Sequence, residues 1–214
     1  MNATPTPARP AQRPRKQAPS APRHPVLIQL AERWPALFGD EPRPLKRGIY
    51  EDLSVALGDT VKAEDLKAAL ALHTRTTRYL NAVATGQPRR DLNALVVEEV
   101  APDQRHHAIV EVHRRRQQRS AEDLTPQTRQ RVVRAFEASG LGQEAYLTLV
   151  RGRDEAINAL TEAAVGEASA TMAREAALLR AFESGGQSVE DFAAGYGMTP
   201  DVAQRMLNRA RQRR

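Results

Sequence analysis

The chain has 214 residues and a formal net charge of +6 at pH 7, with 32 Lys and Arg against 26 Asp and Glu. It contains no cysteine, which excludes disulfide scaffolds, thiol nucleophiles and thiolate metal sites. No run of 18 apolar residues occurs, so no membrane-spanning helix is expected, and the basic balance favours an acidic partner, most commonly nucleic acid.

Residues 1–24 are predicted to form a disordered basic arm. Residues 1–25 hold five basic residues, seven prolines and no acid, and proline blocks helices and strand ladders. The segment has no apolar stretch of the kind that secretory signals carry, so a cytoplasmic protein is expected. Because residues 26–120 carry +2 and residues 121–214 carry −1, most of the excess charge lies in this arm. The arm is either a solvated tail or a tether that adds salt-sensitive affinity for nucleic acid.

Residues 25–119 are predicted to form a mainly helical domain with a small β-hairpin. Apolar residues at helical spacing indicate five helices, and the run at residues 95–97 favours strand. The five helices contain Pro25, Ile49, Leu66, Thr74 and Pro102 respectively, and the hairpin lies within residues 89–100. The helix that opens at Pro102 ends near three arginines, 114–116, which complement the helix dipole without a ligand.

Residues 120–214 are predicted to form an α-helical accessory domain of four or five short helices. Glycines separate its apolar stripes, and Gly166 is expected to divide two of the helices. Residues 188–206 have the pattern of a helix–turn–helix, with Thr199 as the N-cap and Pro200 as the first residue of the second helix. This domain could dimerise, fold over the preceding domain or contact RNA through its terminal arginines, and self-association through these helices is one expected possibility.

Four sequence motifs occur in a fixed order along residues 25–119. The first is VLIQLAERWPALF at residues 26–38, and the second is RPLKRGI at residues 43–49. The third is LKAALALHTRTTRYL at residues 66–80, and the fourth is RRDL at residues 89–92. Together they resemble the ProQ/FinO domain of bacterial RNA chaperones.

This resemblance implies an RNA-binding domain without a catalytic centre, a cofactor or a metal ion. The expected partners are structured RNAs, namely small RNAs and mRNA 3′ ends, and above all terminator-like hairpins with a single-stranded 3′ tail. Such a protein would stabilise small RNAs and promote RNA–RNA pairing in post-transcriptional regulation. The family's RNA-binding positions fall on Lys46, Lys67, Arg78, Tyr79 and Arg89.

The chemistry of neighbouring residues extends this candidate site. Thr74 carries a hydroxyl that can donate to phosphate, and Arg75 lies three residues before Arg78 on the expected helix. Tyr79 is expected to stack on a terminal base. Lys46 precedes a helix N-terminus that favours phosphate. The expected RNA-binding residues are Lys46, Arg47, Lys67, Thr74, Arg75, Arg78, Tyr79, Arg89 and Arg90.

The chain departs from the family pattern at several positions. His73 and Thr77 replace aromatic residues, Ala71 replaces an arginine, and Ala94 replaces a glycine after the fourth motif. These changes lower the density of basic and stacking groups, and Ala94 leaves the turn of the hairpin open.

Two other classes of function compete with the RNA chaperone. A DNA-binding regulator would use the helix–turn–helix-like segment near the C-terminus. A protein-interaction adaptor would bind no nucleic acid at physiological salt. An enzyme is not expected, because the chain has no nucleophile elbow, phosphate-binding loop, dinucleotide turn or zinc-protease motif.

Overall fold

The computed structural model describes residues 24–213, so the expected basic arm lies outside the described residues apart from His24. Within that range the chain is mainly α-helical, with one two-stranded antiparallel sheet, as the sequence predicts. The elements in chain order are α1 (Pro25–Arg33), α2 (Pro35–Phe38), α3 (Ile49–Leu57), the 3₁₀ turn η1 (Gly58–Thr60), α4 (Ala63–Thr74), α5 (Thr77–Ala84), β1 (Arg89–Arg90), β2 (Val96–Glu98), α6 (Pro102–Gln117), α7 (Thr125–Ser139), α8 (Gln143–Val150), α9 (Glu155–Gly185), α10 (Val189–Gly195) and α11 (Pro200–Gln212).

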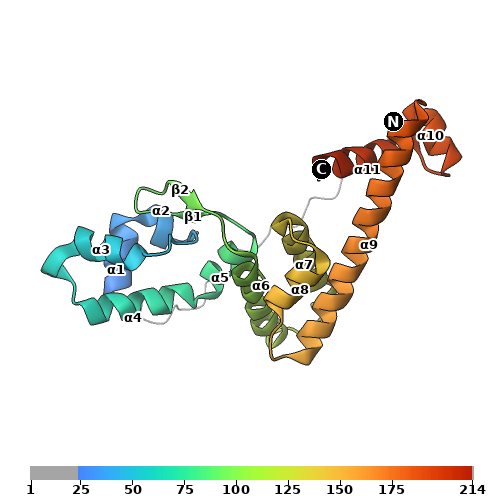
Figure 1. The fold of residues 1–214 in the computed structure, drawn as a ribbon. Helices are drawn as coiled ribbons and strands as arrows, with labels where there is room; N and C mark the ends of the chain where they lie inside the picture. Colours follow the sequence, from blue (N-terminus) through green and yellow to red (C-terminus); the bar gives the residue numbers. More distant parts are fainter. Residues whose placement is uncertain (1–23, 214) are drawn as a thin grey trace, which may run out of the picture.

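Figure 1 shows the order of these elements in space. Helices α1 to α4 and the hairpin lie at one end, α5 to α8 form the middle, and α9 extends to α10 and α11 at the other end. No helix among residues 24–213 is both long enough and apolar enough to cross a membrane.

Capping side chains and prolines decide where several helices begin. The hydroxyl oxygen of Thr76 accepts a hydrogen bond from the backbone N–H of Tyr79 at 3.2 Å, so the helix expected from Thr74 begins at Thr77. Thr199 caps α11 in the same way through the N–H of Val202 at 3.4 Å, and Pro200 is its first residue, as the sequence predicts.

Helix α6 is shared between the two predicted domains. It packs against α5 on one side and against α7 and α8 on the other. Its apolar residues Ile109 and Val112 are fully buried. The larger hydrophobic cluster therefore runs without a break from Val26 in α1 to Ala168 in α9. The proposed division at residues 119 and 120 falls in the loop after α6, and hydrophobic packing crosses it.

Two polar contacts also fasten α6 to the C-terminal helices. The imidazole Nε2 of His106 lies 3.1 Å from the hydroxyl oxygen of Thr161 in α9. Because the Thr161 hydroxyl donates to the Ile157 carbonyl, His106 Nε2 carries the proton and donates to Thr161. Burial lowers the pKa of His106 to about 4, so the ring is neutral at pH 7. His113 Nδ1 lies 2.8 Å from the hydroxyl oxygen of Thr128 in α7.

The expectation that Gly166 separates two helices is wrong. Gly166 lies inside α9, which is one helix of 31 residues. Tertiary packing outweighs the low helix propensity of a single glycine, which costs about 1 kcal/mol. The first part of α9 packs on α7 and α8, and its last part packs on α11.

Helices α10 and α11 form a second, smaller hydrophobic cluster with the end of α9. Phe192 and Leu207 are fully buried in it. The buried carboxylate of Glu175 in α9 accepts hydrogen bonds from Arg209 at 2.5 Å and from Arg213 at 2.6 Å. Arg213 also reaches Glu137 in α7 at 2.8 Å, so charged contacts tie the last helix back to two others.

Candidate nucleic-acid interface

The second and fourth motifs meet at Leu45. Strand β1 holds the loop before α3, because the Arg90 N–H donates to the Pro44 carbonyl at 2.8 Å and the Lys46 N–H donates to the Arg90 carbonyl at 2.9 Å. Leu45 pairs with Arg90 in a parallel bridge, and its buried side chain anchors the loop in the core. The chain from 44 to 46 is therefore a fixed part of the sheet edge, and the direction of Lys46 and Arg47 follows from it.

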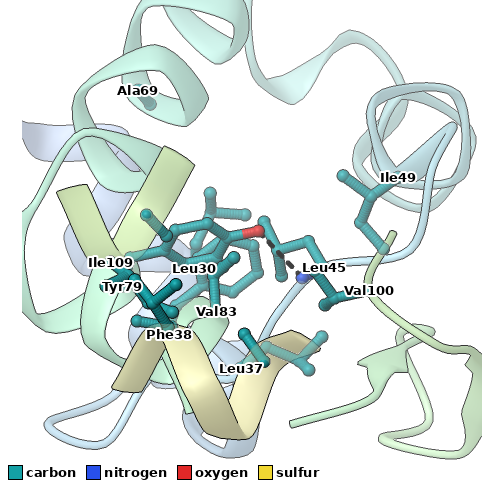
Figure 2. Packing of buried hydrophobic residues seen from close by; sticks show 14 of the residues in the cluster. Leu30, Leu37, Phe38, Leu45, Ile49, Ala69, Tyr79, Val83, Val100 and Ile109 are labelled. Atoms are coloured by element: carbon teal, nitrogen blue, oxygen red, sulfur yellow. Dashed lines mark hydrogen bonds between the residues drawn. The ribbon is translucent and has the colours of Figure 1, made fainter. Parts of the chain in front are cut away.

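Tyr79 packs in the core next to this loop and forms a hydrogen bond with its backbone. Figure 2 shows its ring packed among Leu30, Phe38, Val83 and Ile109, with the hydroxyl pointing to the backbone of Leu45. The hydroxyl oxygen accepts the Leu45 N–H at 3.1 Å. Only 6% of Tyr79 is exposed, so the expected stacking of its ring on a terminal base does not fit this position. The third motif supplies a positioning residue here, because a buried ring cannot offer a free face.

Arg89 completes the shell around the same loop. Its guanidinium donates to the Leu45 carbonyl at 2.6 Å and to Gln104 of α6 at 2.7 Å. Its side chain is only 12% exposed, and Glu98 lies 3.9 Å away. Arg89 thus joins the hairpin, the loop and α6, and it is one of the residues that line the hollow described below.

Lys46 and Arg47 both carry carboxylate partners at the start of α3. The ammonium of Lys46 lies 2.7 Å from Asp52, and this hydrogen bond raises the pKa of Lys46. Glu98 accepts from both the backbone N–H and the guanidinium of Arg47, at 3.1 and 2.8 Å. These bonds lower the pKa of Glu98 and raise that of Arg47. The helix N-terminus that was expected to receive a phosphate is therefore lined by acidic oxygens.

The junction of α4 and α5 carries Thr74, Arg75 and Arg78. The Thr74 hydroxyl donates to the Leu70 carbonyl at 2.9 Å, so its proton is not available to a phosphate as expected. Arg78 is exposed and lies 3.2 Å from Asp40. The side chain of Arg75 is exposed and makes no ion pair with any residue from 24 to 213.

Lys67 and Arg90 lie away from this junction. Lys67 is exposed on α4 with its ammonium 5.3 Å from the centre of the Tyr50 ring, a cation–π contact. The guanidinium of Arg90 donates to the Ala94 carbonyl at 2.5 Å and closes the hairpin turn. The structure therefore gathers Lys46, Arg47, Tyr79, Arg89 and Arg90 around Leu45, and it places Thr74, Arg75, Arg78 and Lys67 on neighbouring parts of α4 and α5.

A hollow of about 760 Å³ opens beside the Leu45 loop. Thr74, Tyr79 and Arg89 line it, together with residues of α6 and residues 151–154 before α9. Sequence reasoning missed Gln104, which holds Arg89, because a glutamine on a helix carries no motif of its own. No pattern in the sequence indicated that residues 151–154 line this hollow.

Comparison with known proteins decides which family these motifs belong to. Residues 20–125 match the sequence model of the ProQ/FINO family. Residues 20–125 are a ProQ/FINO domain. The matched range contains all nine expected RNA-binding residues and ends at the first residue of α7.

Several bacterial proteins are similar to this ProQ/FINO domain. An RNA chaperone ProQ of Idiomarina loihiensis is 41% identical over 88 residues, which are 39% of this chain and 42% of that protein. An RNA chaperone ProQ of Aliivibrio fischeri is 37% identical over 87 residues, with shares of 39% and 42%. A crystal structure of a FinO-like RNA chaperone from Neisseria meningitidis MC58 has 32% identity, covers 39% of this chain and 85% of its own, and has a TM-score of 0.36. The chain thus spans less than half the length of the curated relatives.

The ProQ/FINO domain keeps an aromatic contact at the position where His73 departs from the family pattern. The buried ring of His73 lies 4.8 Å from Phe38 and 5.2 Å from Tyr79, measured between ring centres. Burial lowers the pKa of His73 to about 4. A neutral imidazole therefore fills the place of the aromatic ring and holds Tyr79 under the Leu45 loop.

Proposed function

We propose that this chain is an RNA-binding protein that acts as an RNA chaperone. The observation that supports this most strongly is the ProQ/FINO domain at residues 20–125, whose similar proteins are named RNA chaperones. The geometry agrees with it, because the motif residues form one fixed framework around Leu45 with cationic groups on its outer side. The chain works by binding, without a catalytic step, in the bacterial cytoplasm.

RNA phosphates would exchange places with carboxylates at two of these cations. Asp52 on Lys46 and Glu98 on Arg47 lie where a phosphate would bind. Ion pairs at an exposed surface contribute little to stability because water and salt screen them, so a phosphate can displace these carboxylates at small cost. Arg75 has no ion pair among residues 24–213. Its guanidinium can therefore bind a phosphate without first losing a carboxylate partner.

We expect the chain to prefer RNA with a free 3′ end because of the hollow beside Arg89. It is concave and about 760 Å³ in volume, and Arg89 supplies charged donors at its wall. A single-stranded tail can enter such a hollow, whereas a duplex end is wider and stiffer. We assign the last nucleotides of a terminator-like hairpin to it, and the hairpin stem to Lys46, Arg47 and Arg78. Binding there would stabilise small RNAs and mRNA 3′ ends and would promote their pairing with a second RNA.

A competition titration of the full chain at physiological salt tests this function. The three ligands are a hairpin RNA with a single-stranded 3′ tail, the same hairpin without the tail, and a duplex DNA of equal length. We expect the tailed hairpin to bind most tightly and Lys46→Ala to weaken it. Equal affinity for all three ligands would contradict the proposed recognition of the 3′ end.

The same titration covers the competing DNA-binding function. Arg209 of α11 and Arg213, which follows that helix, are engaged with Glu175 and so are not free to contact a duplex. A preference for duplex DNA would nevertheless move the function to the C-terminal helices. If the chain bound none of the three ligands, only the function of a protein-interaction adaptor would remain.

A further inference from the structure

Four arginines outside the family motifs gather where α6 ends and α7 passes α5. Arg116 lies in the last turn of α6 and Arg119 in the turn that follows. Arg131 and Arg134 lie three residues apart on α7, so they share one face of that helix. Arg131 is half-buried and the other three are exposed. These four residues are called the arginine patch below.

Contacts with α5 fix the position of the patch. The guanidinium of Arg131 donates to the Asn81 side-chain oxygen at 3.4 Å. Next to it, Arg115 donates to the Arg75 carbonyl at 2.6 Å and to the Thr77 hydroxyl oxygen at 3.5 Å. The patch is therefore continuous with the α4–α5 junction of the candidate interface.

A shallow hollow of about 260 Å³ lies beside Arg116 and Arg119 of the patch. Thr77, Arg115, Arg116 and Arg119 line it together with Glu122, which is exposed and pairs with none of these arginines. Its lining also includes residues of the loop before α7 and of α7 itself. The ProQ/FINO domain and the helical extension thus build one surface.

The charge of the patch is not neutralised within the described part of the chain. None of its four arginines forms an ion pair with a residue from 24 to 213. Several other arginines do pair with carboxylates: Arg114 with Glu111, Arg129 with Glu167 and Arg151 with Glu162. Burial, together with the neighbouring cations Arg116 and Arg134, lowers the pKa of Arg131. Three guanidiniums repel one another here, and an anion placed between them would relieve that repulsion.

The helix dipole explains only part of this arrangement. Arg116 lies at the C-terminus of α6, where a cation is favourable in any case. Arg119 lies beyond that helix, and Arg131 and Arg134 lie in the middle part of α7, short of its last turn. Their gathering therefore requires another cause.

We propose that the arginine patch binds the sugar–phosphate backbone of the RNA held by the ProQ/FINO domain, so that the helical extension forms part of the RNA site. This inference rests on the proposed function. Guanidiniums bind phosphate through two parallel hydrogen bonds, and a row of them across two helices matches a chain of phosphates better than one small anion. Arg131 and Arg134 lie beyond residue 125, where the family match ends, so this contact belongs to the extension.

The test compares two variants of the full chain that carry the same change in charge. The first is Arg116→Gln/Arg119→Gln/Arg134→Gln, which spares the bond between Arg131 and Asn81. The matched control is Arg174→Gln/Arg180→Gln/Arg205→Gln, which removes three exposed arginines from outside both the patch and the hollow beside Arg89. Affinity for the tailed hairpin RNA is measured between 50 and 200 mM salt, and thermal unfolding checks that each variant is folded.

We expect the patch variant to bind roughly tenfold more weakly than the control at physiological salt, with a slope of log K against log salt about 2 units shallower. Should the triple variant fail to fold, Arg134→Gln alone is expected to reduce the slope by about 0.7. Equal affinities and slopes for the patch variant and the control would overturn the inference while leaving the proposed function intact. Absence of RNA binding by the unchanged chain would overturn the proposed function, and the inference with it.

Discussion

At the scale of single residues, Ala94 shows how a departure from the family pattern is accommodated. It lies in the hairpin turn with φ 60°, a left-handed conformation that side chains with a Cβ rarely adopt. Asp91 holds the turn, because its carboxylate accepts the N–H groups of Asn93 and Leu95, both at 2.9 Å. The turn therefore forms without the glycine that the family has there, but at a cost in free energy.

Replacing Ala94 by glycine should stabilise the chain. Ala94→Gly relieves the strain of the positive φ, and we expect the free energy of unfolding to rise by about 1 kcal/mol. Urea unfolding of the full chain measures it. Asn93→Gly is the control, because Asn93 lies next to Ala94 but has no positive φ, and it should not stabilise. A loss of stability in Ala94→Gly would show that the turn is not strained.

His73 links stability to pH. Its pKa in the folded protein is about 4, below the ordinary value of 6.5, so the unfolded chain binds more protons between these values. Above pH 6.5 the neutral ring makes its full contribution to the free energy of unfolding, and this contribution is lost as the pH falls toward 4. His73→Phe removes this titration and also a buried Nε2 without a hydrogen-bond partner. We expect the variant to gain about 2 kcal/mol relative to the unchanged chain between pH 7 and pH 5.

Unfolding of both proteins at pH 7, 6 and 5 checks this expectation. Tyr79 and Phe38 must still pack on the new ring, so the hydrogen bond from Leu45 to Tyr79 should persist. A stability difference that stays constant across the pH range would contradict the assignment of a neutral, buried His73.

At the scale of elements, most helices can be predicted from the sequence, but α9 cannot. Apolar spacing, Pro25, Pro102 and the cap at Thr199 identify helix starts that depend on local chemistry. Gly166 is a local signal as well, yet α9 continues through it because α7 and α8 pack against that part of the helix. Contacts between segments far apart in the sequence decided that outcome.

The candidate site can also be predicted only in part from local sequence. The motifs identify which residues form the framework around Leu45, but their exposure depends on packing. Tyr79 has the sequence pattern of both a stacking group and a core residue, and only the structure shows it covered. The carboxylate partners of Lys46 and Arg47 come from α3 and β2, and Glu98 is 51 residues from Arg47. A pairing so distant leaves no local pattern.

The contacts of α11 with Glu175 yield a prediction at this scale. Glu175→Ala leaves Arg209 and Arg213 without their shared carboxylate, and we expect the docking of α10 and α11 to weaken by roughly 2 kcal/mol. Hydrogen exchange should then speed up in α10 and α11, while α1 to α5 keep their protection. Glu155→Ala is the matched control, because the Glu155 carboxylate is 77% exposed in its pair with Arg151 and should change little. Faster exchange throughout the chain would contradict a local role for Glu175.

At the scale of the whole molecule, α6 connects the ProQ/FINO domain to the extension. Gln104 in its first turn accepts a hydrogen bond from Arg89. In its last turn Arg115 donates to the Arg75 carbonyl, and Arg116 belongs to the arginine patch. The hollow at Arg89 and the arginine patch lie along elements that pack on this one helix. An RNA bound to the framework around Leu45 would therefore also meet residues of the extension.

Crosslinking of the full chain to a tailed hairpin RNA, followed by mass spectrometry of the linked peptides, tests the central claim most directly. We expect crosslinks in the loop at residues 43–48, at the α4–α5 junction and in the hairpin at residues 89–98. We also expect a further set at the end of α6 and in α7. Crosslinks confined to α10 and α11 would contradict the account, because the RNA would then be held by helices outside the ProQ/FINO domain.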